Sequence, residues 1–305
     1  MSSIDTILSD TSARLTPAAQ VRIGYISEAV WSPDGRRLAV AHGGGVSIWI
    51  DGFGGDPQIM LGHEAPVKGL GFSPDSKIIA AASSDTRIRL WLAEHANILS
   101  TLRVHPSAVN TVAFSPNGRY LVSGGADAIA RVTDFTDSYG LLALEGHTGE
   151  IESAAFALNG SVVVSGGRDK TLRVWDTQTG ETRAVFAHND WVRQIGVSAD
   201  GLRIASACKD GRIHIWDMVS QTETRVWDAH TGGVDAIRFS ADGRLIASGG
   251  RDGRVCVWNA ETGALAAALE QHTKPVLTVA FSPNGRYLIS GAGDNLLILW
   301  GIQGE

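Results

Sequence analysis

Short runs of alternating apolar and polar residues fill most of the chain, and turn sequences separate them. Residues 192–195, 203–206 and 212–216 alternate with a period of two, and Asp-Gly pairs stand between them. This period places successive side chains on opposite faces of a strand, and Asp-Gly or Asn-Gly pairs favour tight hairpin turns. No segment has a convincing helical period. The pattern therefore predicts an all-β protein built from antiparallel hairpins.

The alternating pattern recurs about every 42 residues. Six histidines mark it at intervals of 42, 42, 41, 42 and 42 residues: His63, His105, His147, His188, His230 and His272. Each unit closes on a tryptophan, with a threonine in its place in the third unit: Trp49, Trp91, Thr133, Trp175, Trp216, Trp258 and Trp300. Four short strands in a unit of this length are typical of β-propellers. We therefore predict a seven-bladed β-propeller with four antiparallel strands per blade.

The two ends of the chain suggest how the ring closes. The last unit stops after its third strand, at Trp300–Ile302, while residues 16–23 precede the first unit in the register of a fourth strand. We expect this N-terminal strand to complete the last blade, which would leave no broken sheet edge. Residues 1–14 are then a tail, and residues 15–305 are a single propeller domain.

The residues inside each unit point to a known repeat. The fourth unit contains Gly146-His147, Phe156, Ser165–Asp169 and Val174–Asp176, in that order. This series resembles the WD-repeat signature, and the resemblance extends from about residue 15 to residue 305. It implies a rigid ring with variable loops, which presents docking faces for proteins or peptides without doing chemistry.

A serine, a histidine and an aspartate recur at fixed spacing, as in a hydrolase triad. Six copies around a ring are implausible as catalytic sites, so we expect no catalytic residue. The resemblance implies instead a buried hydrogen-bond network in each blade that ends on the tryptophan indole, with partners for both histidine nitrogens. The expected network residues are His63 and Asp85; His105, Ser123 and Asp127; His147, Ser165, Asp169 and Trp175; His188, Ser206, Asp210 and Trp216; His230, Ser248, Asp252 and Trp258; and His272, Ser290, Asp294 and Trp300.

Three units depart from this pattern. The first lacks the Gly-His pair and has Gly43–Gly45 in place of the turn that carries the aspartate, so we expect it to lack the network and to be the loosest blade. The second has Ala81 where a serine is expected, and the third has Thr133 where a tryptophan is expected. The second half of the ring should therefore be the better ordered.

Composition narrows the choice of partners. The 305 residues are 44% hydrophobic and 19% charged, which fits a globular protein and excludes a disordered chain. The net charge of −6 argues against binding to nucleic acid or an anionic membrane. The chain begins without a sustained apolar run, so we expect a cytoplasmic protein. Arginine, with 21 copies against 5 lysines, hints at a GC-rich bacterial source.

Cofactor and metal chemistry have little support in the sequence. Cys208 and Cys256 are too few for a disulfide framework, and we expect free, buried thiols. The repeat histidines are 41 or 42 residues apart, which gives no zinc-ligand spacing. His42, His95 and His214 fall outside the network and are interpreted as surface or packed residues. We expect no metal, no cofactor and no small-molecule substrate.

The resemblance also implies where a partner binds. In propellers of this kind the rim of the central opening is built from residues that follow the Gly-His pair, on the first strand, and from the residue before the turn aspartate. Position by position, the candidate partner-binding residues are Tyr25, Lys68, Asn110, Glu150, Glu152, Arg168, Trp191, Arg193, Lys209, Asp235, Arg251 and Leu277.

Two interpretations of this rim remain open. Trp191 near Arg168, Lys209 and Arg251 has the composition of a binding hot spot suited to a segment that carries carboxylates. Alternatively, the arginines pair with the rim carboxylates on a solvated face, the residues concerned being Arg168, Arg193 and Arg251 with Glu150, Glu152 and Asp235.

Three functions are weighed on this basis. The leading one is a non-catalytic protein–protein or peptide interaction scaffold. A structural subunit of a larger assembly is the alternative, favoured only by Trp227 on an expected outer strand. An enzyme that uses the central cavity would need inward-pointing carboxylates or a metal constellation near the axis, and the sequence offers none beyond the rim.

Overall fold

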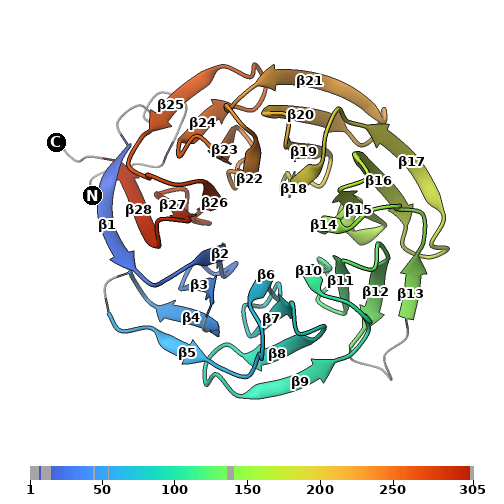
Figure 1. Ribbon diagram of the computed structural model, residues 1–305, viewed down its shortest axis with the longest axis horizontal. Helices are drawn as coiled ribbons and strands as arrows, with labels where there is room; N and C mark the ends of the chain where they lie inside the picture. Colours follow the sequence, from blue (N-terminus) through green and yellow to red (C-terminus); the bar gives the residue numbers. More distant parts are fainter. Residues whose placement is uncertain (1–6, 8–14, 44, 54, 136–140, 303–305) are drawn as a thin grey trace.

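The structure is a computed structural model, which describes residues 7, 15–43, 45–53, 55–135 and 141–302. Seven four-stranded antiparallel sheets surround a central axis, each with its first strand innermost (Figure 1). The described residues form no α-helix, and the single helical turn is the 3₁₀ segment η2 (Leu158–Gly160). The predicted seven-bladed, all-β propeller is confirmed.

The first four blades follow one another along the chain. Blade one consists of β2 (Ile26–Trp31), β3 (Arg37–His42), β4 (Gly45–Ile50) and β5 (Gln58–Met60). Blade two consists of β6 (Val67–Phe72), β7 (Ile78–Ser83), β8 (Ile88–Leu92) and β9 (Ile98–Leu102). Blade three consists of β10 (Val109–Phe114), β11 (Tyr120–Gly125), β12 (Ala130–Asp134) and β13 (Leu141–Leu144). Blade four consists of β14 (Ile151–Ala157), β15 (Val162–Gly167), β16 (Thr171–Asp176) and β17 (Thr182–Ala187).

The remaining blades repeat this order. Blade five consists of β18 (Val192–Val197), β19 (Arg203–Cys208), β20 (Arg212–Asp217) and β21 (Thr222–Asp228). Blade six consists of β22 (Val234–Phe239), β23 (Leu245–Gly250), β24 (Val255–Asn259) and β25 (Leu265–Leu269). Blade seven consists of β26 (Val276–Phe281), β27 (Tyr287–Ala292), β28 (Leu296–Ile302) and β1 (Leu15–Arg22).

The N-terminal strand closes the ring as predicted. β1 pairs antiparallel with β28, from Leu15 opposite Ile302 to Arg22 opposite Leu296. In Figure 1 the blue β1 lies along the outer side of the red β28. Of the expected tail 1–14, only Ile7 is described. Its side chain is buried in the core cluster shared by blades six and seven, and its N–H donates to the carbonyl of Gly285 over 2.6 Å.

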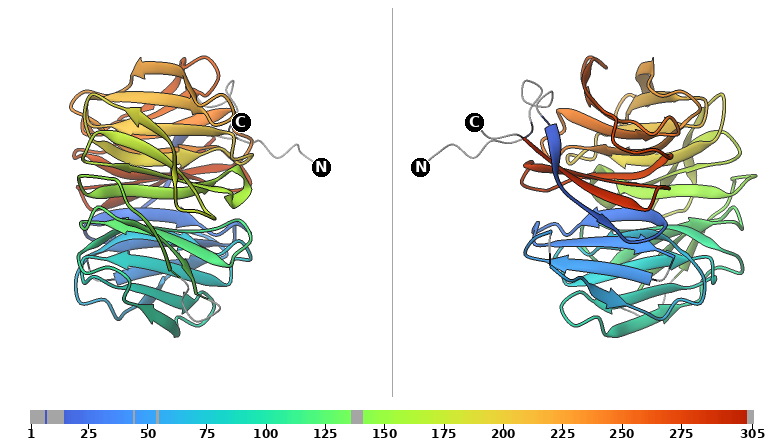
Figure 2. Two further views of the ribbon diagram at one scale, coloured as in Figure 1. Left: turned by 90° about the vertical axis from the view of Figure 1, so that its right-hand side faces the viewer. Right: turned by 60° about the vertical axis from the view of Figure 1, so that its left-hand side comes forward.

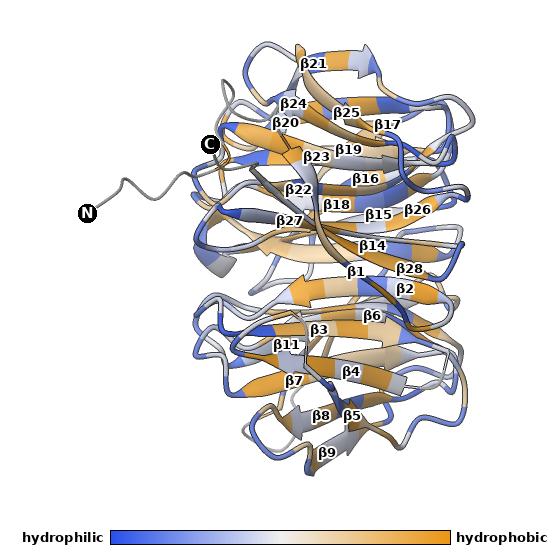
Figure 3. Cartoon of the chain, turned by 90° about the vertical axis from the view of Figure 1, so that its left-hand side faces the viewer, coloured by the Kyte–Doolittle hydropathy of each residue, from blue (hydrophilic) through white to orange (hydrophobic). Residues whose placement is uncertain are grey.

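The core lies between neighbouring sheets. All six residues of β15 are buried, and Figure 3 shows apolar stretches along the strands with polar turns at both faces of the ring. Glycine in the second strand lets adjacent blades approach closely. A Cβ atom on Gly166 would lie 2.4 Å from Val192 Cγ1, and one on Gly249 would lie 2.6 Å from Val276 Cγ1. The blades therefore pack without room for a side chain at these positions.

The ring has two faces that differ in their turns (Figure 2). We call the face formed by the turns between second and third strands the upper face. The opposite, lower face carries the turns between first and second strands. Because each first strand starts at the upper face, the loops that lead into it also lie there, beside the entrance to the central opening.

Candidate partner-binding face

A β-bulge at the start of every inner strand displaces one residue from the sheet register. The residues before and after the displaced residue pair with the second strand, whereas the displaced residue has no partner there. An unpaired bulge residue bends the strand and re-aims its side chain. The displaced residues are Ser27, Lys68, Asn110, Glu152, Arg193, Asp235 and Leu277. Six of the seven are residues that the sequence placed at the rim.

A second set of rim residues is fixed by backbone hydrogen bonds. The residue before each turn aspartate donates its N–H to a carbonyl two residues before the bulge residue. This bond measures 2.8 Å from Arg168 to Glu150, 2.9 Å from Lys209 to Trp191 and 3.0 Å from Arg251 to Gly233. The turns are thereby tied to the inner strands, and their side chains are held at the edge of the opening.

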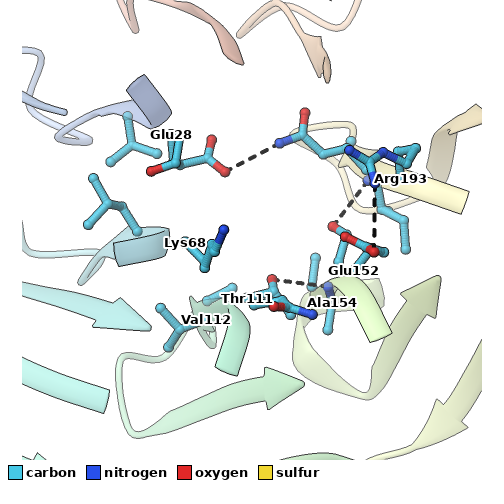
Figure 4. Close-up of a pocket in the computed structure, with 18 of the residues that line it drawn as sticks. Glu28, Lys68, Thr111, Val112, Glu152, Ala154 and Arg193 are labelled. Atoms are coloured by element: carbon cyan, nitrogen blue, oxygen red, sulfur yellow. Dashed lines mark hydrogen bonds and ion pairs between the residues drawn. The ribbon is translucent and has the colours of Figure 1, made fainter. Parts of the chain in front are cut away.

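The opening contains a cavity of about 500 Å³. Eight of the twelve candidate residues line it: Tyr25, Lys68, Asn110, Glu152, Arg168, Arg193, Asp235 and Leu277. Figure 4 shows Glu28, Lys68, Glu152 and Arg193 directed into this space from different blades. The other four candidates do not line the cavity: Glu150 and Trp191 contact Arg168, Arg251 contacts Asp235, and Lys209 contacts Trp191.

The rim arginines are paired with rim carboxylates. Arg168 binds Glu152 and also reaches Glu150, at 3.0 Å. Arg193 lies 3.0 Å from Asp235 and 3.7 Å from Glu152. Arg251 contacts the same Asp235 at 3.1 Å. These contacts agree with the second interpretation of the rim, in which the three arginines pair with rim carboxylates. The positive charges of the arginines are therefore already balanced.

Trp191 lies between two cations. The guanidinium carbon of Arg168 is 4.8 Å from the centre of its ring, and the ammonium of Lys209 is 3.9 Å from it. Both distances are within the range of cation–π attraction. Within the described part of the chain, no carboxylate pairs with Lys209. Its ammonium is thus available to a partner, whereas the arginines are engaged.

A charged group that sequence reasoning missed spans the opening. Glu28, on β2, accepts hydrogen bonds from Arg238 at 3.0 Å, Gln194 at 3.3 Å and Thr278 at 3.4 Å. Burial raises the pKa of the Glu28 carboxyl, although the charge of Arg238 and the hydrogen bonds oppose that shift. The signal in the sequence was weak. Glu28 and Arg238 are charged at inner-strand positions where most other units have small residues.

The expected hydrogen-bond network is complete in blade four. His147 Nδ1 lies 2.8 Å from Asp169 and Nε2 lies 2.8 Å from Ser165, whose hydroxyl also accepts from Trp175 Nε1 at 2.7 Å. Blades six and seven hold the same contacts, through His230, Ser248, Asp252 and Trp258, and through His272, Ser290, Asp294 and Trp300.

Blades one to three lack parts of the network at the expected places. In blade two, Ala81 leaves His63 Nε2 and Trp91 Nε1 buried without a hydrogen-bond partner, while His63 Nδ1 still lies 2.8 Å from Asp85. In blade three, His105 contacts Asp127 and Ser123. Because Thr133 stands in place of the tryptophan, this blade has no indole N–H to donate to Ser123. In blade one, Trp49 Nε1 donates instead to the Gly55 carbonyl at 3.1 Å.

Blade five departs from the expectation of a complete network. His188 Nε2 lies 2.8 Å from Ser206, and Trp216 donates to the same hydroxyl, but no hydrogen bond joins His188 to Asp210. Cys208 stands where blades three, four and six have glycine. A Cβ atom on the matching Gly250 would lie 2.2 Å from the histidine and 2.4 Å from the aspartate of blade six. A side chain at this position does not by itself prevent the contact, because Ser83 in blade two and Ala292 in blade seven leave the histidine within hydrogen-bond distance of the aspartate.

Burial determines the ionisation of the network histidines and the two thiols. It lowers the pKa of His105, His230 and His272, so their rings are neutral in the folded chain. It raises the pKa of Cys208 and of Cys256 to about 12. Both cysteines are free and buried, as the sequence predicted.

Two further features bear on the alternatives. The ring centre of Trp227, on the outer strand β21, lies 5.8 Å from that of Trp258, and a Cβ atom on Gly263 would lie 3.1 Å from the Trp227 ring. This packing within blades five and six accounts for Trp227 without a partner subunit. Among the described residues there is no helix with the length and apolar character needed to cross a membrane.

The ring of seven four-stranded blades, with a serine-histidine-tryptophan network repeated in four of them, defines a β-propeller of the WD-repeat class. The chain belongs to the family described as "WD domain, G-beta repeat", whose model matches residues 55–91, 96–134, 140–176, 180–217, 221–259 and 263–301. These segments cover more than half of the chain, and the first begins only at the end of blade one.

Two curated relatives share parts of the sequence. Residues of this chain are 44% identical to "Periodic tryptophan protein 2" of Arabidopsis thaliana over 46 residues, which is 15% of this chain and 5% of the relative. They are 31% identical to "WD repeat-containing protein SL1-17" of Schistosoma mansoni over 91 residues, 30% of this chain and 28% of the relative. The matches thus span less than a third of either relative.

Proposed function

We propose that this chain is a non-catalytic platform that binds a segment of another protein on the upper face, around the central opening. WD-repeat propellers are typically protein-interaction scaffolds and generally do no chemistry. The observation that carries the proposal for this chain is the aromatic ring of Trp191, held between Arg168 and Lys209 above a polar cavity. Pre-ordered aromatic anchors of this kind dominate binding energy at interfaces.

The partner segment in this proposal carries a carboxylate next to an apolar side chain. Lys209 is the cation beside Trp191 that lacks a carboxylate partner within the described chain, so it can accept one from the segment. Tyr25, 52% exposed at the opposite side of the opening, offers a second aromatic surface. The arginines Arg168 and Arg193 are already paired with rim carboxylates, so they are less available to the segment than Lys209.

The test is affinity purification from the source organism with a variant that alters only the proposed contact. Trp191→Ala with Lys209→Ala removes the anchor and its free cation. Arg193 is left intact, because its loss would take a partner from Asp235, whose side chain is only 3% exposed. The matched control, Val219→Ser with Arg244→Ala, changes exposed residues at lower-face turns.

The proposal expects the upper-face variant to lose at least one partner that both the wild type and the control retain, with unchanged thermal unfolding. Isothermal titration of each lost partner should then show at least a tenfold weaker Kd for the variant. An identical set of partners for all three proteins would refute binding through this face.

A further inference from the structure

A cluster of possible metal ligands lies in blade five, outside the central cavity. Cys208 at the end of β19, Asp210 in the following turn and His214 on β20 each offer one ligand atom, and these atoms all lie within 4.8 Å of one another. None of the three lines the cavity. The spacing Cys-x-Asp-x₃-His is not a known zinc-binding motif, so the sequence alone did not reveal the cluster. The three side chains come together across the turn between β19 and β20.

His214 is oriented as a metal ligand would be. Its Nδ1 lies 2.5 Å from Glu223 on β21, and because a carboxylate only accepts, Nδ1 carries the proton. Nε2 then presents a lone pair, yet it is buried and no described residue bonds to it. The residue is only 7% exposed. A histidine that binds a metal through one nitrogen almost always donates the other N–H to a carboxylate or a carbonyl.

The three residues are exceptions within the repeat. Gly167 and Gly250 occupy the position of Cys208 in the neighbouring blades, and Arg173 and Cys256 occupy that of His214. Asp210 makes no hydrogen bond to His188, unlike the matching aspartates of the other network blades, and accepts a hydrogen bond from the Arg212 backbone over 3.0 Å. The other blades fold without a cysteine, an exposed aspartate and a histidine at these three positions. The requirements of the fold therefore do not explain why blade five has them.

We propose that Cys208, Asp210 and His214 bind one zinc ion, with Glu223 as a positioning residue that fixes the His214 tautomer. A sulfur, an imidazole nitrogen and a carboxylate oxygen are the ligand types that zinc takes. Zinc bonds of about 2.0–2.3 Å need ligand atoms about 3.5 Å apart, so the side chains close in by about an ångström. Binding releases the thiol proton of Cys208 to solvent. Asp210 is exposed, which gives the ion a path from solvent.

Cobalt(II) titration of the full chain tests the site, since a cysteine ligand gives a thiolate-to-cobalt charge-transfer band in the near ultraviolet. Metal-free wild type should develop the band with one Co²⁺ per chain, and one equivalent of Zn²⁺ should abolish it. Cys208→Gly restores the glycine of the neighbouring blades and should lose the band. His214→Arg and Asp210→Asn should each weaken binding at least tenfold, and Glu223→Gln about tenfold.

Cys256→Ser is the matched control, because it removes the other buried thiol and leaves the cluster intact; it should bind like the wild type. Circular dichroism establishes that each variant is folded, and the exposed Asp210→Asn remains informative if a buried variant does not fold. Absence of the thiolate band in wild type, its persistence in Cys208→Gly or its loss in Cys256→Ser would each overturn the assignment.

Discussion

In each blade with a complete network, one serine hydroxyl forms hydrogen bonds with two buried groups, the histidine ring and the tryptophan indole. Ser165 contacts both His147 and Trp175, whereas the alanine at the matching position of blade two leaves both groups without partners. An unsatisfied buried polar atom costs about 1–3 kcal/mol. The difference between the blades is therefore energetic and can be measured by exchanging the two residues.

Ala81→Ser should stabilise the protein. The new hydroxyl can bond to His63 Nε2 and Trp91 Nε1, and we expect a gain of about 1 kcal/mol in the free energy of unfolding, measured by urea titration. The reciprocal Ser165→Ala should lose about 1–3 kcal/mol. A neutral or destabilising effect of Ala81→Ser would show that His63 Nε2 and Trp91 Nε1 are not placed to bond to one hydroxyl as in blade four.

His272 should make stability depend on pH. Burial lowers its folded pKa below the ordinary value of 6.5, while the charge of Asp294 and its hydrogen bond oppose the shift. The unfolded chain therefore binds a proton near pH 6.5 that the folded chain does not. The free energy of unfolding should fall as the pH drops below 6.5. Urea titrations at pH 7.5 and 5.5 should show a smaller fall for His272→Gln than for the wild type, and equal falls would contradict the assignment.

At the scale of strands and blades, the sequence was highly informative. The period of two and the turn residues predicted the hairpins, and the seven-fold recurrence predicted the ring and its closure by β1. The bulges were not predicted, because they depend on how each inner strand meets its neighbour in three dimensions. The expected contact between His188 and Asp210 of blade five is also absent, and Cys208 alone does not explain this, because blades two and seven keep the contact with Ser83 and Ala292 at the same position.

Blade one should exchange its amide hydrogens faster than blade four. β4 pairs with β5 over only three residue pairs, and His42 of this blade contacts Ser47 of its own sheet at 2.9 Å. β16 is paired on both sides and joined to a complete network. Hydrogen exchange followed by mass spectrometry should show lower protection for residues 45–50 than for residues 171–176. Equal protection would mean that the network contributes little to local stability.

At the scale of the whole ring, the sequence predicted which residues lie at the rim but not which of them pair with one another. The resemblance to WD-repeat propellers, carried over position by position, assigned eight residues that line the cavity. Which arginine meets which carboxylate depends on contacts between blades, such as Arg193 of blade five with Asp235 of blade six, and the sequence left both interpretations open. Glu28 was missed for the same reason, because its partners lie in blades five, six and seven.

Glu28→Ala should weaken the ring by taking a partner from Arg238 and Gln194 near the axis. We expect a loss of about 1–3 kcal/mol in the free energy of unfolding, below the usual cost of breaking a fully buried pair because Arg238 is partly exposed. Glu150→Ala, at a more exposed rim carboxylate, is the control and should change stability by no more than about 0.5 kcal/mol. Equal effects of the two variants in urea titrations would show that the contacts of Glu28 do not brace the ring.

The central claim is that a partner docks over the upper face, and site-specific photo-crosslinking tests it most directly. A photoreactive phenylalanine derivative replaces Tyr25, which is exposed and lines the cavity, or Val219, which is 74% exposed at a lower-face turn. Both proteins are irradiated in cells of the source organism, and the adducts are identified by mass spectrometry. The account predicts a specific adduct from position 25 and none from position 219; adducts from position 219 alone would contradict it.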